Sequence, residues 1–320
     1  MKNFNLPGIQ SHFFLNTYLL ELKANKPEYF YPDVNITSVY GAFQYCIWDG
    51  GRNFPAYTPM TEEEMLTVKE AYDHYGVPIR FVFTNPLIEE VHLHNRFCNL
   101  QLELFHEEKN EIAINSPLLE DYIRTNYPKY KFISSTTKRI TNPDLLIKEL
   151  EKPQYYQVCL DYDLNKNMDL LNSIPKELRS KCEFLANAIC QAHCPDRKGH
   201  YAKNGQAHMS YLKDRYAIPH CSIANKGTSH PDKRGKGNNL SIEDIDKYQK
   251  MGYKYFKLEG RTFHSMMQLY ENLYYLIKPE WYWEILSEVI GIEGVYYNCP
   301  NNTVKYQRME FPYLAQNIGL

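Results

Sequence analysis

Short runs of β-branched and aromatic residues alternate along the chain with longer amphipathic segments. The short runs predict strands and the longer segments predict helices. We expect eight strands, near Thr37–Phe43, Ile79–Thr84, Glu111–Asn115, Lys131–Thr136, Tyr156–Asp161, Cys182–Asn187, Pro219–Ile223 and Tyr253–Leu258. Because strands that alternate with helices form parallel sheets, the pattern indicates an α/β protein.

Two of the expected helices carry clear start and stop signals. In "TEEEMLTVKEAYDHYG", Thr61 and Glu64 form a capping box and Gly76 stands where the helix should end. "SIEDIDKYQKMG" repeats the arrangement, with Ser241 as the first cap and Gly252 as the stop. These signals place helices after the first expected strand and before the last.

Eight alternating strands predict a (β/α)8 TIM-like barrel, distorted or incomplete, over residues 1–278. A doubly wound open sheet is the alternative, but it usually carries a glycine-rich nucleotide turn after its first strand. The corresponding stretch "VYGAFQYCIWDGGR" lacks the G-x-G-x-x-G pattern, which disfavours that fold. Residues 279–320 predict a C-terminal helix and an extended tail packed on the barrel.

Composition narrows the class of protein. The 320 residues carry a formal net charge of −2, which gives no strong signal for nucleic acid. No apolar stretch is long enough for a signal peptide or a membrane span, so we expect a cytoplasmic protein that does not bind membranes. Eight cysteines in such a chain predict reduced thiols, some of which could bind metal.

Four cysteines lie where a barrel would bring them to one rim. Cys46 follows the first expected strand, Cys190 and Cys194 follow the sixth, and Cys221 lies near the end of the seventh. Four thiolates suit an iron–sulfur cluster or zinc, and two buried core cysteines remain the plain alternative. A radical SAM motif needs a third cysteine where Arg197 stands.

Polar side chains at strand ends are the candidates for substrate chemistry, because barrel active sites are built there. Glu259 and Arg261 follow the last strand and either hold a substrate or pair with each other. Asp161 is a candidate general base, and His200 a candidate proton donor beside the cysteines. Candidate substrate-binding residues are Arg52, Asn187 and Arg197.

The stretch "YFKLEGRTFHSMMQLYENLYYLI" resembles the strand end "KIEGR" and following helix of the peptidase U32 family. Three further stretches resemble that family in the same order: "SVYGAFQYCIWDGGR", "CEFLANAIC" and "PHCSIANKG…NNLSIEDIDKYQKMGYKYFKLEGR". The resemblance covers roughly Asn35–Ile277. The chain departs from the family at "PDRKGHY", where a serine-rich loop is usual, and in its short segment after "EGR".

The resemblance implies a barrel-like fold and, as in the oxygen-independent hydroxylase branches, a [4Fe–4S] cluster on four cysteines. By position, Cys190, Cys194 and Cys221 match cluster ligands, and Cys46 matches an N-terminal ligand of one branch. We therefore expect an oxygen-independent, hydroxylation-type modification of a small aromatic or nucleoside-like substrate, with an electron-donor protein as partner. The alternatives are a U32-type peptidase and a non-catalytic binding protein stabilised by a metal such as zinc.

Overall fold

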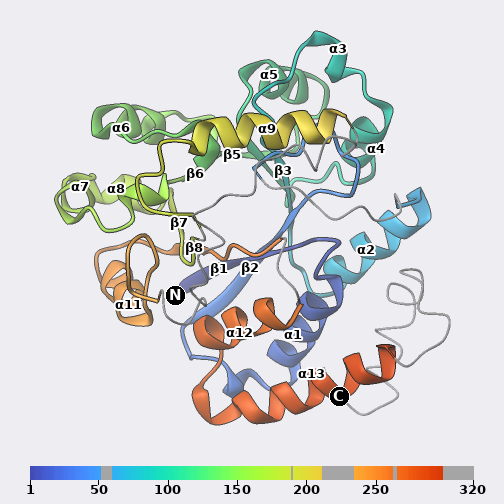
Figure 1. Cartoon of the computed structure of the whole chain (residues 1–320), viewed down its shortest axis with the longest axis vertical. Coiled ribbons are helices and arrows are strands. Elements are labelled where there is room, and N and C mark those ends of the chain that lie inside the picture. Colours follow the sequence, from blue (N-terminus) through green and yellow to red (C-terminus); the bar gives the residue numbers. More distant parts are fainter. Residues whose placement is uncertain (52–59, 189, 211–233, 262–264, 298–320) are drawn as a thin grey trace.

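A closed barrel of eight parallel strands forms the centre of the computed structural model (Figure 1). The structure describes residues 1–51, 60–188, 190–210, 234–261 and 265–297, with side chains described up to residue 291. The strands, each hydrogen-bonded to the next around the ring, are β1 (Lys2–Pro7), β2 (Val34–Gly41), β3 (Ile79–Phe83), β4 (Glu111–Ile114), β5 (Lys131–Ser134), β6 (Tyr155–Cys159), β7 (Cys182–Leu185) and β8 (Tyr255–Lys257).

The predicted TIM-like barrel is confirmed, and it is complete, because β8 pairs with β1. The sequence analysis did not predict β1. The first six expected strands therefore correspond to β2 to β7. The strand expected at Pro219–Ile223 lies outside the described residues. It is not needed for closure, since β7 pairs directly with β8.

Helices join and cover the strands. They are α1 (Phe13–Asn25), α2 (Glu62–His74), α3 (Glu90–Leu93), α4 (Arg96–Leu104), α5 (Pro117–Asn126), α6 (Pro143–Glu151), α7 (Met168–Ser173), α8 (Lys176–Arg179), α9 (Arg197–Met209), α11 (Ile242–Lys250), α12 (Ser265–Leu276) and α13 (Tyr282–Tyr297). Both predicted capping boxes are present, at Thr61 with Glu64 and at Ser241 with Asp244. Gly76 has the positive φ of 65° that a residue with a side chain resists.

Charged and polar side chains fill part of the barrel interior. Arg80 Nε donates to Glu111 Oε2 at 2.6 Å, and its other nitrogens bond Glu183 and Gln157. The Asn5 amide donates to Glu183 Oε1 at 2.5 Å. Because buried charges are tolerated only when they are paired and hydrogen-bonded, this network fixes strands β1, β3, β4, β6 and β7 relative to one another.

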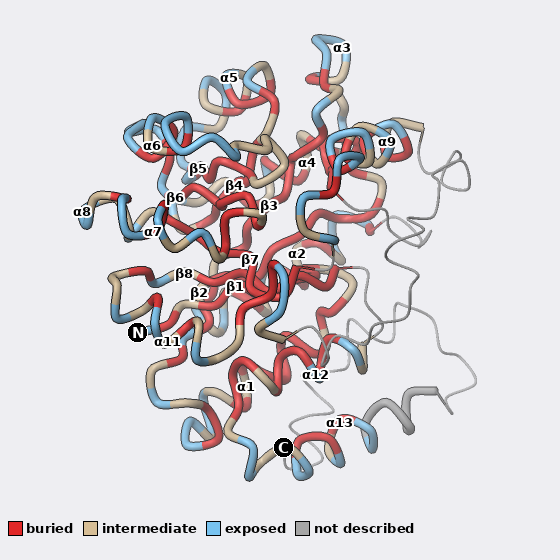
Figure 2. Tube along the Cα trace, turned by 60° about the vertical axis from the view of Figure 1, so that its left-hand side comes forward, coloured by how far each residue is buried: buried red, intermediate tan, exposed pale blue. Residues whose placement is uncertain are grey.

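Two helical layers lie at opposite ends of the molecule. Helix α9 crosses above β3 and β5 in Figure 1, whereas α1, α12 and α13 stack at the other end, an arrangement also visible in Figure 2. The strands between these layers are mostly buried (Figure 2).

The C-terminal helix contacts the first helix and the turn after it. Trp281 stacks on Tyr29 with ring centroids 4.1 Å apart, and Tyr18 donates a hydrogen bond to Glu288 at 2.6 Å. The tail expected after this helix lies outside the described residues. In the described part of the chain, no helix combines the length and the apolar character that crossing a bilayer requires.

Candidate functional site at the barrel rim

A cavity of about 500 Å³, including its open mouth, lies at the carboxyl ends of the strands. Most of its lining is polar or aromatic and comes from six strands or the loops after them, with α9 adding one residue. The polar and aromatic lining residues are Tyr40, Thr84, Ser135, Thr136, Thr137, Tyr162, Tyr201, Lys257, Glu259 and Arg261. This is the location at which TIM-like barrels place their active sites.

Of the predicted catalytic residues, Glu259 and Arg261 line this cavity. Arg261 binds Asp49 through two contacts, from Nη1 to the carboxylate oxygens at 2.8 and 3.1 Å, and its Nη2 donates to the Gly50 carbonyl at 2.8 Å. His208 Nε2 of α9 lies 3.8 Å from Asp49 Oδ2. The Asp49 carboxylate therefore holds together the loop after β2, the loop after β8 and the far part of α9.

Asn187 connects the ends of β7 and β8. Its amide nitrogen donates to the Glu259 carbonyl at 3.0 Å, and its oxygen accepts from the Glu259 backbone N–H at 2.6 Å. The same nitrogen also donates to Glu271 Oε2 at 3.0 Å. Both polar atoms of the amide are bonded inside the protein, so Asn187 positions the Glu259 backbone, and its substrate-binding role stays a prediction.

Asp161 and Asp163 lie after β6 and face two arginines. Arg139 Nη1 is 2.7 Å from Asp161 Oδ2 and 3.0 Å from Asp163 Oδ2, and Arg197 Nη1 is 2.9 Å from Asp163 Oδ2. Burial raises the pKa of Asp161. Burial has the same effect on Asp163, but hydrogen bonds from Arg197, the His193 backbone and Arg139 outweigh it, so the pKa of Asp163 is lowered.

Arg197 is buried among these carboxylates. Its side chain is 1% exposed, its Nη2 donates to the Gln191 carbonyl at 2.6 Å, and its guanidinium lies 4.0 Å from the centroid of the Tyr162 ring. These contacts join the cysteine loop to the loop after β6. The two terminal nitrogens of Arg197 are directed to protein groups, whereas its buried Nε has no hydrogen-bond partner among the described residues. Its substrate-binding role stays a prediction.

The cysteine pair predicted from sequence is brought together. Cys190 lies near enough to both Cys194 and Arg197 to interact with them electrostatically. Burial is the main cause that raises the pKa of the Cys194 thiol, with the neighbouring Cys190 adding to it. Cys190 packs against the cluster of Tyr162, Leu185 and Ala188, and Tyr162 and Leu185 of this cluster line the cavity. The pair therefore lies directly behind the cavity wall.

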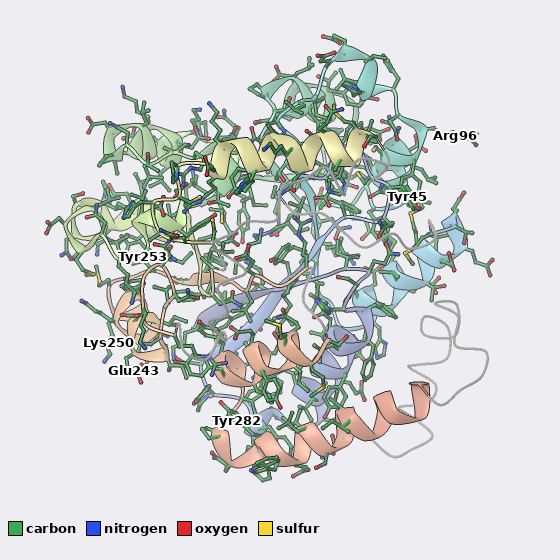
Figure 3. All side chains as sticks on the ribbon, in the orientation of Figure 1. Tyr45, Arg96, Glu243, Lys250, Tyr253 and Tyr282 are labelled. Carbon is green, nitrogen blue, oxygen red and sulfur yellow. The ribbon has the colours of Figure 1, made fainter. Side chains whose placement is uncertain are left out.

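Cys46 is not brought to this pair. Its sulfur lies 3.5 Å from that of Cys98 in α4. Figure 3 shows the preceding residue, Tyr45, beside α4 at the end of α9 that is remote from α7 and α8. His208 of α9 contacts Asp49 of the loop that carries Cys46, and it lies eleven residues, about 16 Å at 1.5 Å per residue, along the helix from Arg197 near the cysteine pair.

The remaining predicted residues fall in different places. Arg52 and Cys221 lie outside the described residues. His200 is half-buried near the start of α9, and its neighbour Tyr201 is the α9 residue that lines the cavity. Within the described part of the chain, no group of three or more histidine, cysteine or acidic side chains is placed to hold a metal ion.

Three residues that the sequence interpretation did not select are central to the rim. Asp49 binds Arg261, Arg139 binds both aspartates, and Lys257 lines the cavity. Asp49 and Lys257 lie inside two of the quoted motifs, "WDGG" and "KLEGR". Their position in these motifs is the sequence feature that could have identified them as site residues. Arg139 had no comparable signal, because its role depends on a fold-dependent contact.

Comparison with known proteins gives a distant but consistent result. No family model matches the chain. A curated protein of Methanocaldococcus jannaschii, named uncharacterized protease MJ1657, is 25% identical over 210 residues, which are 64% of this chain and 62% of that protein. The solved structure of the U32 peptidase Mk0906 covers 81% of this chain and 93% of that one, with 13% identity and a TM-score of 0.47. The chain is thus similar to each of these two proteins.

This chain spans about 62% of the length of MJ1657. Both similar proteins carry names that describe them as a protease or peptidase. Two of the stretches that resemble the U32 family lie on neighbouring strands of the barrel. "KLEGR" ends β8 beside the cavity, and the cysteine pair follows β7, the neighbouring strand.

Proposed function

We propose that this U32-like chain is an iron–sulfur enzyme that carries out an oxygen-independent, hydroxylation-type redox modification in the rim cavity. The carrying observation is the position of Cys190, which packs against the cluster of Tyr162, Leu185 and Ala188, and two of these residues, Tyr162 and Leu185, line the cavity. A redox group bound to the cysteine pair would therefore lie one side chain away from a bound substrate.

Cys190 and Cys194 fit two positions of a cluster ligand set. They lie near each other just after β7, with the Arg197 guanidinium close to Cys190. Cysteine binds metal as the thiolate. Cys221, predicted from the sequence as a third ligand, lies outside the described residues. Cys46 is left out of the proposed set because its sulfur packs against Cys98. A bound [4Fe–4S] cluster supplies one-electron chemistry.

The aromatic walls of the cavity support a small aromatic or nucleoside-like substrate. Tyr40, Tyr162 and Tyr201 line it, and the hydroxyls of Tyr162 and Tyr201 lie 3.1 Å apart. Tyrosine rings stack on planar ligands while their hydroxyls bind polar edges. Glu259 provides a carboxyl group at the same wall for proton transfer. The reaction would also require an electron-donor protein.

Metal content tests this proposal. We expect anaerobically purified protein to contain iron and acid-labile sulfide and to show the broad visible absorption of a cluster. Cys190→Ser and Cys194→Ser should each lower bound iron several-fold. Cys182→Ser is the matched control, because Cys182 is equally a cysteine of this region but opens β7 and is buried at the other end of the strand.

A second variant distinguishes a ligand set that includes Cys46 from one that does not. Cys46→Ser should retain iron, because its sulfur contacts Cys98 and not the Cys190–Cys194 pair. Zinc without sulfide in the purified protein, or full iron in both the Cys190 and the Cys194 variants, would overturn the proposal. Zinc would instead support a metal-stabilised binding protein.

A peptidase is the second candidate, and the names of the two similar proteins favour it. The sequence contains no G-x-S-x-G or H-E-x-x-H motif, and the described lining of the cavity includes no histidine. Incubation with unfolded casein decides between them. Cleavage that survives removal of metal and disappears in Glu259→Gln would support the peptidase and contradict the redox proposal.

A further inference from the structure

Lys257 is a buried lysine that lines the rim cavity. It ends β8, its residue is 8% exposed, and its side chain is part of the cavity lining. Nζ lies 3.9 Å from the centroid of the Tyr40 ring. Among the described residues, no carboxylate or other acceptor is hydrogen-bonded or ion-paired to this nitrogen, which is unusual for a buried lysine.

The charged groups around Lys257 do not neutralise it. Glu183 faces it from β7 but is bonded to Arg80 and Asn5. Arg80 and Arg261 oppose its positive charge, while Cys159 and Glu183 favour it. Burial is the largest effect, and together these groups lower the pKa of Lys257. A desolvated amine near other cations is the environment in which lysine becomes a nucleophile.

The cavity also contains a second polar group without a partner. Thr84 is 1% exposed, and its hydroxyl has no hydrogen-bond partner among the described residues although it lines the same cavity. A buried hydroxyl without a partner costs free energy, and a bound ligand would recover it. Lys257 and Thr84 come from strands on different sides of the ring, so one small ligand could contact both.

We propose that the Lys257 amine captures the carbonyl group of a small aldehyde or ketone as an imine. The nitrogen lone pair forms a bond to the carbonyl carbon, and the carbonyl oxygen takes up a proton. The carbon–oxygen bond then breaks, and the oxygen leaves as water with the two protons that the amine nitrogen loses. Nothing is oxidised or reduced, so the step needs no cluster and does not depend on the redox proposal.

Reductive trapping tests this inference on the full-length, anaerobically purified protein. The protein is incubated at pH 7 with cyanoborohydride and either acetaldehyde or glyoxylate, and labelling is followed by peptide mass spectrometry. We expect Lys257 to be alkylated several-fold faster than the exposed Lys254, since the fraction of an amine in its reactive neutral form rises as its pKa falls. A preference for glyoxylate over acetaldehyde would identify an anionic carbonyl compound as the ligand class.

The wild-type protein alone can overturn the proposal. Equal labelling rates at Lys257 and Lys254 would show that the buried amine is not a carbonyl site. Lys257→Arg should abolish the fast phase of labelling, whereas Lys138→Arg should keep it, because Lys138 is paired with Glu149 at 3.0 Å. Iron and sulfide are measured on the same sample, so loss of the cluster and loss of the imine are recorded separately.

Discussion

Two neighbouring aspartates at the rim show that the role of a residue depends on the partners that the fold brings to it. Asp161 and Asp163 were both visible in "LDYDLNKN", and Asp161 was the predicted general base. In the fold both carboxylates bind arginines, and Asp163 also accepts hydrogen bonds from the His193 backbone and the Asn238 side chain. Asp163 is thus the anchor of the cysteine loop, a role that depends on partners distant in sequence.

Asp163→Asn should destabilise the protein by about 3 kcal/mol, because it leaves the buried Arg197 with one carboxylate fewer. The free energy of unfolding in urea measures this. Asp73→Asn is the control, since Asp73 pairs with lysines at a partly exposed surface and should cost at most about 1 kcal/mol. Equal losses in the two variants would contradict the anchoring role.

The same carboxylate gives a pH dependence. The pKa of Asp163 is lower in the folded protein than in the unfolded chain, so its stabilisation is fully present above the ordinary aspartate pKa of about 4. That stabilisation is lost as the pH falls below about 4 and toward the folded value. Wild type should therefore lose more stability on acidification than Asp163→Asn does, a difference that urea unfolding at pH 6 and pH 3.5 can detect.

At the scale of elements, α9 is the feature that sequence reasoning did not anticipate. Its segment "RKGHYAKNGQAHM" contains Gly199 and Gly205, which lower helix propensity, and no strong amphipathic pattern. The helix lies against the barrel instead: Asn85 donates to the Gly205 carbonyl at 3.1 Å, and Asn204 donates to the Gly51 carbonyl at 2.9 Å. The stretch "DRKGHY", where the sequence departs from the U32 pattern, forms the cap and start of this helix, and Tyr201 of the helix lines the cavity.

The two glycines of α9 make a matched pair of substitutions. A Cβ at position 205 would lie 2.2 Å from Asn85 Oδ1, whereas a Cβ at position 199 meets nothing within 4 Å. Gly205→Ala should therefore lower stability by about 1–3 kcal/mol. Gly199→Ala should raise it by up to about 1 kcal/mol. Thermal unfolding of both variants checks the prediction, which fails if the two melting temperatures move in the same direction.

For the whole molecule, the barrel was predictable because β-branched and aromatic runs recur between helices. The first strand of the barrel was not predictable, because the barrel interior is partly polar. β1 reads "KNFNLP", and Asn5 within it points to the inward-facing Glu183 and to Ser38. A pattern that assigns polar residues to the outside misses such a strand. The Cys46–Cys98 contact was equally hidden, since its members are 52 residues apart.

The interior network gives a prediction for the whole barrel. Arg80→Met should cost at least about 3–5 kcal/mol, because it leaves Glu111 and Glu183 buried without their cation. Urea unfolding measures the loss. Lys109→Met is the control and should change stability by less than about 1 kcal/mol, because Lys109 pairs at the surface.

The pairing of β1 with β8 has a consequence during protein synthesis. The two strands that close the ring are separated by almost the entire described barrel, with Asn3 of β1 aligned with Tyr255 of β8. While the chain emerges from the ribosome, β1 has no partner on that side until residues 255–257 appear. Its edge is exposed during this interval, and contacts so distant in sequence form slowly. Ring closure is therefore a late event, and the nascent chain is open to edge-to-edge aggregation until it occurs.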